Sequence, residues 1–206
     1  LTGAAKADSL ANMQVRRPVV VVGGGLTAID TATESLAYYP IQVEKFLKRY
    51  EALVAEHGSE AVDRSWSQEE RAIAEEFLSH AYAIRSERDE AATEAREARI
   101  VPLLQSWGGA TIAYRRLLVD SPSHTLNHEE VEKALEEGIW FGEGLTPLAI
   151  EVDAHGHASG LKVSQHHNDG DGVWHEYGRT TLPARTILIA AGTQPNTVLA
   201  REDADH

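Results

Sequence analysis

The sequence contains no cysteine. This absence excludes a disulfide framework, a redox-active Cys-x-x-C pair and a thiolate zinc site within these residues. Any redox chemistry must therefore come from a bound cofactor. The sequence also lacks an apolar run near the roughly 20 residues of a membrane-spanning helix, and it does not open with a signal-peptide pattern. We expect a cytoplasmic protein with no membrane partner.

Positive charge is scarce. The chain has 19 Lys and Arg residues against 32 Asp and Glu residues, which gives a net charge of -13 and a pI near 5.2. This balance disfavours nucleic acid as the main partner. The 206 residues suffice for one large domain or two small ones. Because the chain begins at Leu1 rather than Met, we interpret it as a piece of a longer polypeptide.

A glycine-rich stretch follows the most apolar run of the chain. The valines Val19 to Val22 predict a strand buried on both faces, and three glycines separate it from a helical pattern that begins at Leu26. In the pattern G-x-G-x-x-A, Gly23 makes the turn, Gly25 lets a pyrophosphate approach the backbone, and Ala28 lets the helix pack close to the strand. The N–H groups at the helix start favour an anion there. The alternative is a glycine-rich turn that binds nothing. The predicted contacts are Gly23, Gly24, Gly25, Leu26, Thr27 and Ala28.

The second strand of a dinucleotide-binding unit is delayed by a helical insertion, residues 38–108. The first helix is expected to end near Ala37, with a boundary at Pro40. Two apolar stripes follow, one ending at His57-Gly58 and one beginning after the N-cap Ser67 and continuing as an exposed helix to Arg99. We interpret the segment as an inserted helical hairpin. It is either a decoration or a docking surface for another redox domain or subunit.

The delayed strand, Ala110 to Tyr114, ends in Arg115 and Arg116. At this position an acidic residue would bind the ribose 2′-OH of NAD, whereas arginine suits the 2′-phosphate of NADP. Tyr114, Arg115 and Arg116 are therefore predicted cofactor contacts, with NADPH favoured over NADH. The alternative is a pair of solvated arginines.

The second half of the chain predicts a helix and several short strands. Ser121 to His124 is expected to form a turn, and Asn127 is expected to cap a helix that ends before Gly138. A short strand at 139–141 follows, and period-two patterns at 146–152, 158–165 and 173–177 predict an antiparallel meander. Residues 187–190 predict a final buried strand. Ala191-Gly192 after it would allow a ligand to approach the backbone.

Metal sites and catalytic residues are not indicated. The aspartates at 168–172 lack the remaining ligands of a calcium loop, and the adjacent His166 and His167 would point to opposite faces of a strand. All ten histidines are interpreted as structural or exposed. We find no acid, base or nucleophile to nominate.

The expected fold is α/β, with a Rossmann-like parallel sheet, an antiparallel β-meander and an inserted α-helical hairpin. Residues 1–37 and 109–200 would form the NAD(P)H-binding domain and residues 38–108 the insertion.

These features together resemble the NADPH-binding domain of the pyridine nucleotide–disulfide oxidoreductase superfamily, nearest to the glutamate synthase small-subunit group of flavoproteins. The resemblance rests on Val-Val-Val-Val-Gly-Gly-Gly-Leu-Thr-Ala-Ile-Asp30, Ile-Ala-Tyr-Arg-Arg116, the helix from His128 to Gly138 with its following strand and meander, and Thr186-Ile-Leu-Ile-Ala-Ala-Gly-Thr-Gln-Pro-Asn196. It covers about residues 1–38 and 109–196.

The resemblance implies a domain inserted into an FAD-binding domain of the same polypeptide. Gly23 to Thr27 would lie at the pyrophosphate, Arg115 and Arg116 at the 2′-phosphate, and Ala191-Gly192 near the junction of the two cofactor sites. NADPH would then deliver hydride to the flavin. The sequence departs from the family at Leu26, where asparagine is common, and it carries no FAD fingerprint, so FAD is expected in the parent protein and not in this piece.

Two functions from different classes follow. The first is the nucleotide-binding domain of an FAD-dependent, NADPH-using oxidoreductase, inactive by itself. The alternative is a non-enzymatic dinucleotide-sensing or partner-docking module. A free-standing dehydrogenase fits poorly because little of the chain remains to supply a substrate site.

Overall fold

The computed structural model describes residues 2–6 and 13–192. A short helix, α1 (Thr2–Ala5), comes first. A four-stranded parallel sheet is built from β1 (Val19–Val22), β2 (Ala110–Ala113), β3 (Ile139–Gly142) and β7 (Thr186–Ile189) in the order β3-β2-β1-β7. Val19 pairs with Ala110 on one side and with Thr186 on the other. The predicted α/β class with a parallel sheet is confirmed.

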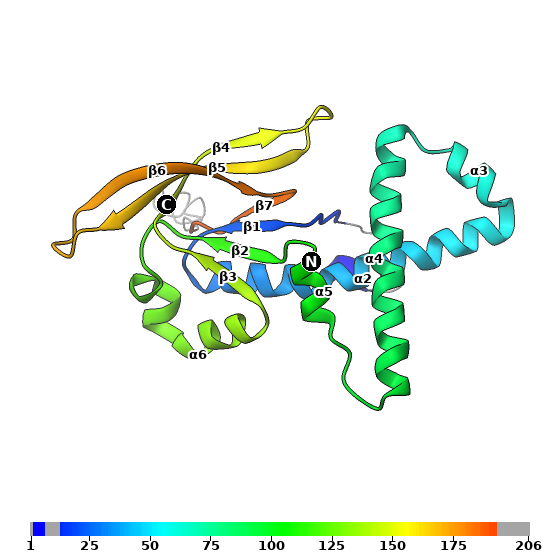
Figure 1. Ribbon diagram of the computed structural model, residues 1–206, viewed down its shortest axis with the longest axis horizontal. Coiled ribbons are helices and arrows are strands. Elements are labelled where there is room, and N and C mark those ends of the chain that lie inside the picture. Colours follow the sequence, from blue (N-terminus) through cyan, green and yellow to red (C-terminus); the bar gives the residue numbers. More distant parts are fainter. Residues whose placement is uncertain (1, 7–12, 193–206) are drawn as a thin grey trace, which may run out of the picture.

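The connections between these strands form two layers on the sheet. Between β1 and β2 lie α2 (Leu26–His57), α3 (Ser59–Arg64), α4 (Gln68–Thr93) and α5 (Ile100–Ser106). Between β2 and β3 lie the short 3-10 turn η1 (Leu118–Asp120) and α6 (Pro122–Glu136). The predicted antiparallel meander, β4 (Leu145–Val152), β5 (Ala158–Asn168) and β6 (Trp174–Pro183), joins β3 to β7. Figure 1 shows α2 and α6 below the parallel sheet and the meander above it.

The valines of β1 serve both layers because neighbouring strand residues point to opposite faces. Val19 and Val21 belong to the core that the sheet shares with the helices. Val20 belongs to a second core between the sheet and the meander, with Leu161 and Val163 of β5. All three valines are at most 1% exposed, as expected for a strand covered on both faces.

Pro40 does not end the first helix. α2 continues through it to His57, where Gly58 follows as predicted. A proline removes one helix hydrogen bond, but its neighbours Tyr38 and Tyr39 are buried against the core and hold the segment in place. The parallel-sheet unit and the insertion therefore share one helix.

The insertion consists of helices joined by short irregular segments, and it is not a simple hairpin. Ser67 caps α4 by the predicted pairing, since its hydroxyl accepts a hydrogen bond from the Glu70 N–H and its own N–H donates to the Glu70 carboxylate. α4 ends at Thr93 rather than near Arg99, because the chain reverses at Ala95, whose φ is 51°. The extra helix α5 was not predicted.

Two expectations in the second half were wrong. Ser121 to His124 is a helix start and not a turn: the Ser121 hydroxyl caps α6 by accepting from the His124 N–H at 3.1 Å. Asn127 has a non-helical backbone, with φ -159°, between two helical segments of α6, so a helical segment does begin after it as predicted. The final strand is not buried either, because β7 lies at the edge of the sheet and Ile189 is 70% exposed.

The sequence also predicts a short helix over residues 7–14, and most of this segment, like the motif residues 193–196, lies outside the described residues. Within the described ranges, no helix combines the length and apolar character needed to cross a membrane.

Candidate functional site

Gly23 lies where two backbone segments meet. A Cβ atom at this position would be 2.3 Å from the carbonyl oxygen of Ala190 and 3.1 Å from the Cβ of Ala28. Any larger residue would therefore force apart the end of β7 and the first turn of α2. Ala28 is fully buried, which agrees with its expected role in close helix–strand packing.

Gly24 is held between two neighbours. A Cβ atom on it would be 2.2 Å from the ring of Tyr114, so the tyrosine packs directly against the glycine backbone. The Gly24 carbonyl accepts hydrogen bonds from the Ser123 N–H at 3.2 Å and from the Ser123 hydroxyl at 3.0 Å. The first turn of α6 thus fixes the glycine loop. The sequence reading missed Ser123, although the Ser121-Pro-Ser pattern marks a helix start.

Gly25 differs from the other two because it faces open space. A Cβ atom there would meet no atom of the described residues within 4 Å. Gly25 is the N-cap of α2, and its carbonyl accepts from the Ala28 N–H at 2.9 Å. The first N–H groups of a helix lack a carbonyl partner one turn back, so an anion placed at this opening would meet N–H donors and the positive end of the helix dipole.

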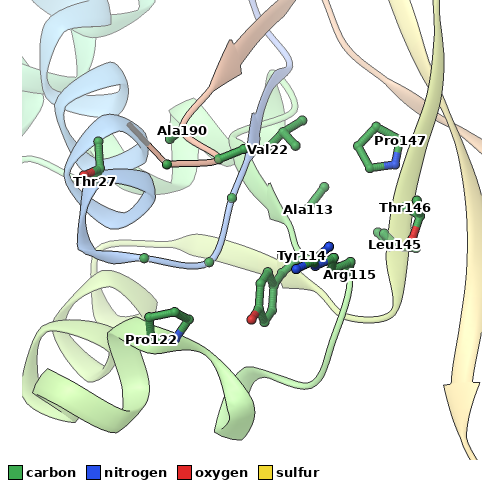
Figure 2. Close-up of a pocket in the computed structure, with 15 residues that line it drawn as sticks. Val22, Thr27, Ala113, Tyr114, Arg115, Pro122, Leu145, Thr146, Pro147 and Ala190 are labelled. Atoms are coloured by element: carbon green, nitrogen blue, oxygen red, sulfur yellow. The ribbon is translucent and has the colours of Figure 1, made fainter. Parts of the chain in front are cut away.

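These elements surround one cleft at the carboxyl ends of β1, β2 and β7. Figure 2 shows Tyr114 and Arg115 between the glycine loop and the meander, with Leu145, Thr146 and Pro147 of the meander beyond them on the right. The cleft has a volume of about 520 Å³. Its lining residues are Val22, Gly23, Gly24, Gly25, Thr27, Ala113, Tyr114, Arg115, Pro122, Leu145, Thr146, Pro147, Ala190, Ala191 and Gly192. Ligands of open α/β sheets bind at this edge, where the connections diverge to opposite faces.

Most of the predicted contact residues line this cleft, and three do not. Ala28 is buried beneath the loop, and Leu26 and Arg116 are not part of the lining. Arg116 is exposed and contributes its carbonyl, which accepts from the Gly144 N–H at 3.2 Å. Whether the lining residues contact a nucleotide stays a prediction.

The meander supplies a wall that the sequence reading missed. Leu145, Thr146 and Pro147 are the first residues of β4, and the Leu145 N–H donates to the Tyr114 carbonyl at 2.9 Å. No local pattern marks these residues as ligand contacts, since only the folding of the meander over the sheet brings them to the cleft.

The electrostatics of the cleft are simple. Among its lining residues, all of them in the described part of the chain, Arg115 is the one with a charged side chain. The chain as a whole carries a net charge of -13, yet none of the described residues that line this opening is a carboxylate. The cleft is therefore locally favourable for an anion. Across the described residues, no group of three or more His, Cys, Asp or Glu side chains is placed to hold a metal ion.

A second polar cluster lies at the opposite edge of the sheet. Arg17, just before β1, donates to the carbonyls of Gly109 at 2.8 Å and Ser35 at 3.1 Å, and its guanidinium lies 4.9 Å from the centre of the Tyr39 ring. Arg17 is 2% exposed, and this burial lowers its pKa to about 10. These contacts join α2 to the starts of β1 and β2.

His80 of α4 completes this cluster. Its Nδ1 lies 2.6 Å from the Tyr39 hydroxyl, and its ring stacks on Trp107 with 3.8 Å between ring centres. Burial, with the nearby Arg17 charge, lowers the pKa of His80 to about 4, while burial raises the pKa of Tyr39. Tyr39 therefore donates to a neutral imidazole. The cluster attaches the insertion to the sheet and lies away from the cleft.

No family model matches the sequence. The uncharacterized protein RP006 of Rickettsia prowazekii (strain Madrid E) is 33% identical over 207 residues, an alignment that covers 95% of this chain and 27% of that protein. The chain thus spans about a quarter of the length of this curated relative.

Two solved structures align with weak scores. The ferredoxin reductase for the CYP199A2 system from Rhodopseudomonas palustris has a TM-score of 0.40 at 12% identity, covering 90% of this chain and 26% of that one. The covalent putidaredoxin reductase–putidaredoxin complex has a TM-score of 0.37 at 12% identity, covering 91% and 27%.

Proposed function

We propose that this chain is the NADPH-binding domain of an FAD-dependent oxidoreductase. It would position NADPH for hydride transfer to a flavin held by an FAD-binding domain of the same polypeptide. The observation that carries the proposal is the open side of Gly25 at the start of α2, in a cleft whose charged lining side chain is Arg115.

The cleft fits each part of the nucleotide in turn. The pyrophosphate lies against Gly25 and the first turn of α2, where a glycine leaves the space that a side chain would fill. Arg115 lies at the end of β2, where it binds the 2′-phosphate that distinguishes NADPH from NADH. The nicotinamide half extends toward Ala191 and Gly192, beyond the end of β7.

The chain contributes binding and orientation. NADPH supplies the hydride when it is bound, and Tyr114 is the one lining residue besides Arg115 with a titratable side chain. Tyr114 is packed against Gly24, so its role is to shape the loop.

The proposal also assigns the chain to a longer flavoprotein with a separate FAD-binding domain. The likeness of the motifs to the glutamate synthase small-subunit group supports a flavin partner, and the relative's greater length leaves room for an FAD-binding domain. The insertion extends away from the sheet in Figure 1 and exposes Leu53 and Tyr82, which supports docking of a further redox domain or subunit there.

The test is a calorimetric titration of the 206-residue chain with NADPH and with NADH at moderate salt, which screens nonspecific charge effects. We expect NADPH to bind more tightly. Equal affinities would contradict the recognition of the 2′-phosphate by Arg115, and no binding of either nucleotide would reject the proposed function. Flavin absorbance in the purified longer polypeptide would favour the oxidoreductase over a dinucleotide-sensing module, which would bind NADPH without flavin.

A further inference from the structure

One end of the meander extends past the core that holds the rest of it. Leu161 and Val163 of β5 are buried in the core between the meander and the parallel sheet. Farther along β4, Ile150 and Val152 are both more than half exposed. Apolar packing therefore supports only weakly the part of the meander formed by residues 150–158, which we call its free end.

The insertion reaches the free end through one carboxylate. Glu69, in the first turn of α4, has one oxygen 2.8 Å from Nε2 of His157 and the other 3.2 Å from Nδ1 of His155. Both histidines lie in the turn between β4 and β5. Figure 1 shows this turn beside the upper end of α4. Because each carboxylate oxygen faces a different histidine, the contact fixes the turn at two points.

The turn is held in a shape that suits this contact. The Asp153 carboxylate accepts hydrogen bonds from the backbone N–H groups of His157 and His155, both at 2.9 Å. The Gly156 N–H donates to the Asp153 carbonyl at 3.1 Å. The bonds from His157 and then His155 lower the pKa of Asp153 from its usual value. The two imidazoles are therefore faced by two carboxylates, Asp153 of the turn and Glu69 of α4.

The helix side of the contact is ordered independently of the turn. The capping box of Ser67 and Glu70 fixes the start of α4. Arg71 donates to the Asp63 carbonyl at 2.7 Å, which ties the same helical turn to α3. Glu69 lies between these residues. Since local bonds already order both partners, the contact costs little further conformational entropy.

The strand β4 connects this contact to the nucleotide cleft. Its first residues, 145–147, line the cleft, and its last residue, Val152, precedes the turn. The insertion is connected to the other side of the cleft, because α2 begins after its N-cap Gly25 and continues into the insertion. The contact at Glu69 therefore closes a ring that runs from the glycine loop through α2, α3 and α4 to β4 and back to the cleft wall.

We propose that Glu69 is a positioning residue that straps the free end of the meander to the insertion and keeps the cleft wall closed over the bound nucleotide. It acts through β4 and does not contact the ligand. The effect on nucleotide release rests on the proposed function, whereas the strap itself can be measured without any nucleotide.

The first experiment measures hydrogen exchange of the backbone amides at the free end in the 206-residue chain without nucleotide. It compares Glu69→Ala with the matched control Glu75→Ala, an exposed glutamate of the same helix. Exposed ion pairs contribute little, so we expect exchange about two- to fivefold faster in Glu69→Ala and unchanged in Glu75→Ala. Equal exchange rates in Glu69→Ala and the unsubstituted chain would overturn the strap, and so would an equal increase in both variants.

The second experiment restores the strap by a covalent link. Because the sequence has no cysteine, Glu69→Cys combined with His157→Cys introduces a single pair of thiols, which a short bismaleimide can join. With both thiols blocked by N-ethylmaleimide, NADPH should dissociate about two- to fivefold faster than from the unsubstituted chain. Joining the thiols should restore the original dissociation rate. Equal melting temperatures of the blocked and unsubstituted chains would establish that the variant folds.

The outcomes separate this inference from the function on which it rests. If the unsubstituted chain binds NADPH and the blocked variant releases it no faster, Glu69 does not position the cleft wall and the proposed function stands. Faster release that the link does not reverse would also overturn the positioning role. Failure of the unsubstituted chain to bind NADPH or NADH would reject the proposed function and the effect on release, while the exchange rates would still decide whether the strap exists.

Discussion

Replacing Gly23 and Gly25 separately by alanine should divide the glycine loop into a structural half and a binding half. The same methyl group is added two residues apart, but it meets different surroundings. At Gly23 it would be 2.3 Å from the Ala190 carbonyl oxygen and 2.9 Å from its carbon, both backbone atoms. At Gly25 it would meet no atom of residues 2–6 or 13–192 within 4 Å, and the backbone there, with φ -96° and ψ 176°, is available to any residue.

The magnitudes follow from these surroundings. Overpacking against fixed backbone costs about 1–3 kcal/mol, so Gly23→Ala should lower the melting temperature by roughly 2–12 °C for a chain of this size. Gly25→Ala loses only the preference for glycine over alanine at a helix N-cap, under about 1 kcal/mol. Its methyl group would stand where the pyrophosphate approaches, however. Loss of one hydrogen bond to a charged oxygen, about 1.5–3 kcal/mol, would weaken NADPH binding about tenfold to a hundredfold.

Thermal unfolding monitored by circular dichroism measures the first effect, and calorimetric titration of folded protein with NADPH measures the second. The reasoning would be refuted by a Gly23→Ala chain as stable as the unsubstituted one, or by a Gly25→Ala chain that binds NADPH with undiminished affinity. The first result would show that Gly23 is not in close contact with Ala190. The second would show that the pyrophosphate does not bind at the opening beside Gly25.

Three further predictions use the same assays. Arg115→Ala should weaken NADPH binding about tenfold or more with little effect on NADH binding, because it removes a charge-assisted bond to the 2′-phosphate. Arg116 lies outside the cleft lining, so Arg116→Ala should have a smaller effect on NADPH binding. A larger loss in Arg116→Ala than in Arg115→Ala would assign the phosphate to Arg116. His80 binds its proton less tightly in the folded chain, where its pKa is about 4, than in the unfolded chain. Its contribution to stability is therefore present above about pH 6.5 and lost as the pH falls toward 4. The free energy of unfolding, measured by denaturation at both pH values, should depend less on pH in His80→Gln than in the unsubstituted chain, and an equal pH dependence would contradict the assignment. Ser123→Ala should lower the free energy of unfolding by about 1 kcal/mol, because the Gly24 carbonyl loses a buried hydrogen bond, and an unchanged denaturant midpoint would show that this bond contributes nothing.

Local signals were sufficient for the elements with strong periodicity or clear capping. The valine strand, the start of α2 at Leu26, the Ser67 capping box and the glycine end at Gly58 were all predicted from short stretches. Each depends on groups only a few residues apart, which the sequence places together in any fold.

Local signals failed where packing opposed them. Pro40 indicated a helix boundary, but burial of the flanking tyrosines holds α2 together across it. The apolar run from Ile187 indicated a buried strand, yet its position in the sheet leaves β7 at an edge. The net effect of a proline or an apolar run depends on neighbours that are distant in the chain.

The sequence by itself determined the glycine loop, the strand before it and the helix after it, because their residues interact over a few positions. It also indicated Arg115 at the end of the second strand. Only the tertiary structure decided that Arg115 lines the cleft and Arg116 does not, that Ser123 holds Gly24, and that the meander places Pro147 over the cleft. These contacts join residues up to about a hundred positions apart, and their geometry is fixed by sheet order and by the length of the hairpin, which no local pattern encodes.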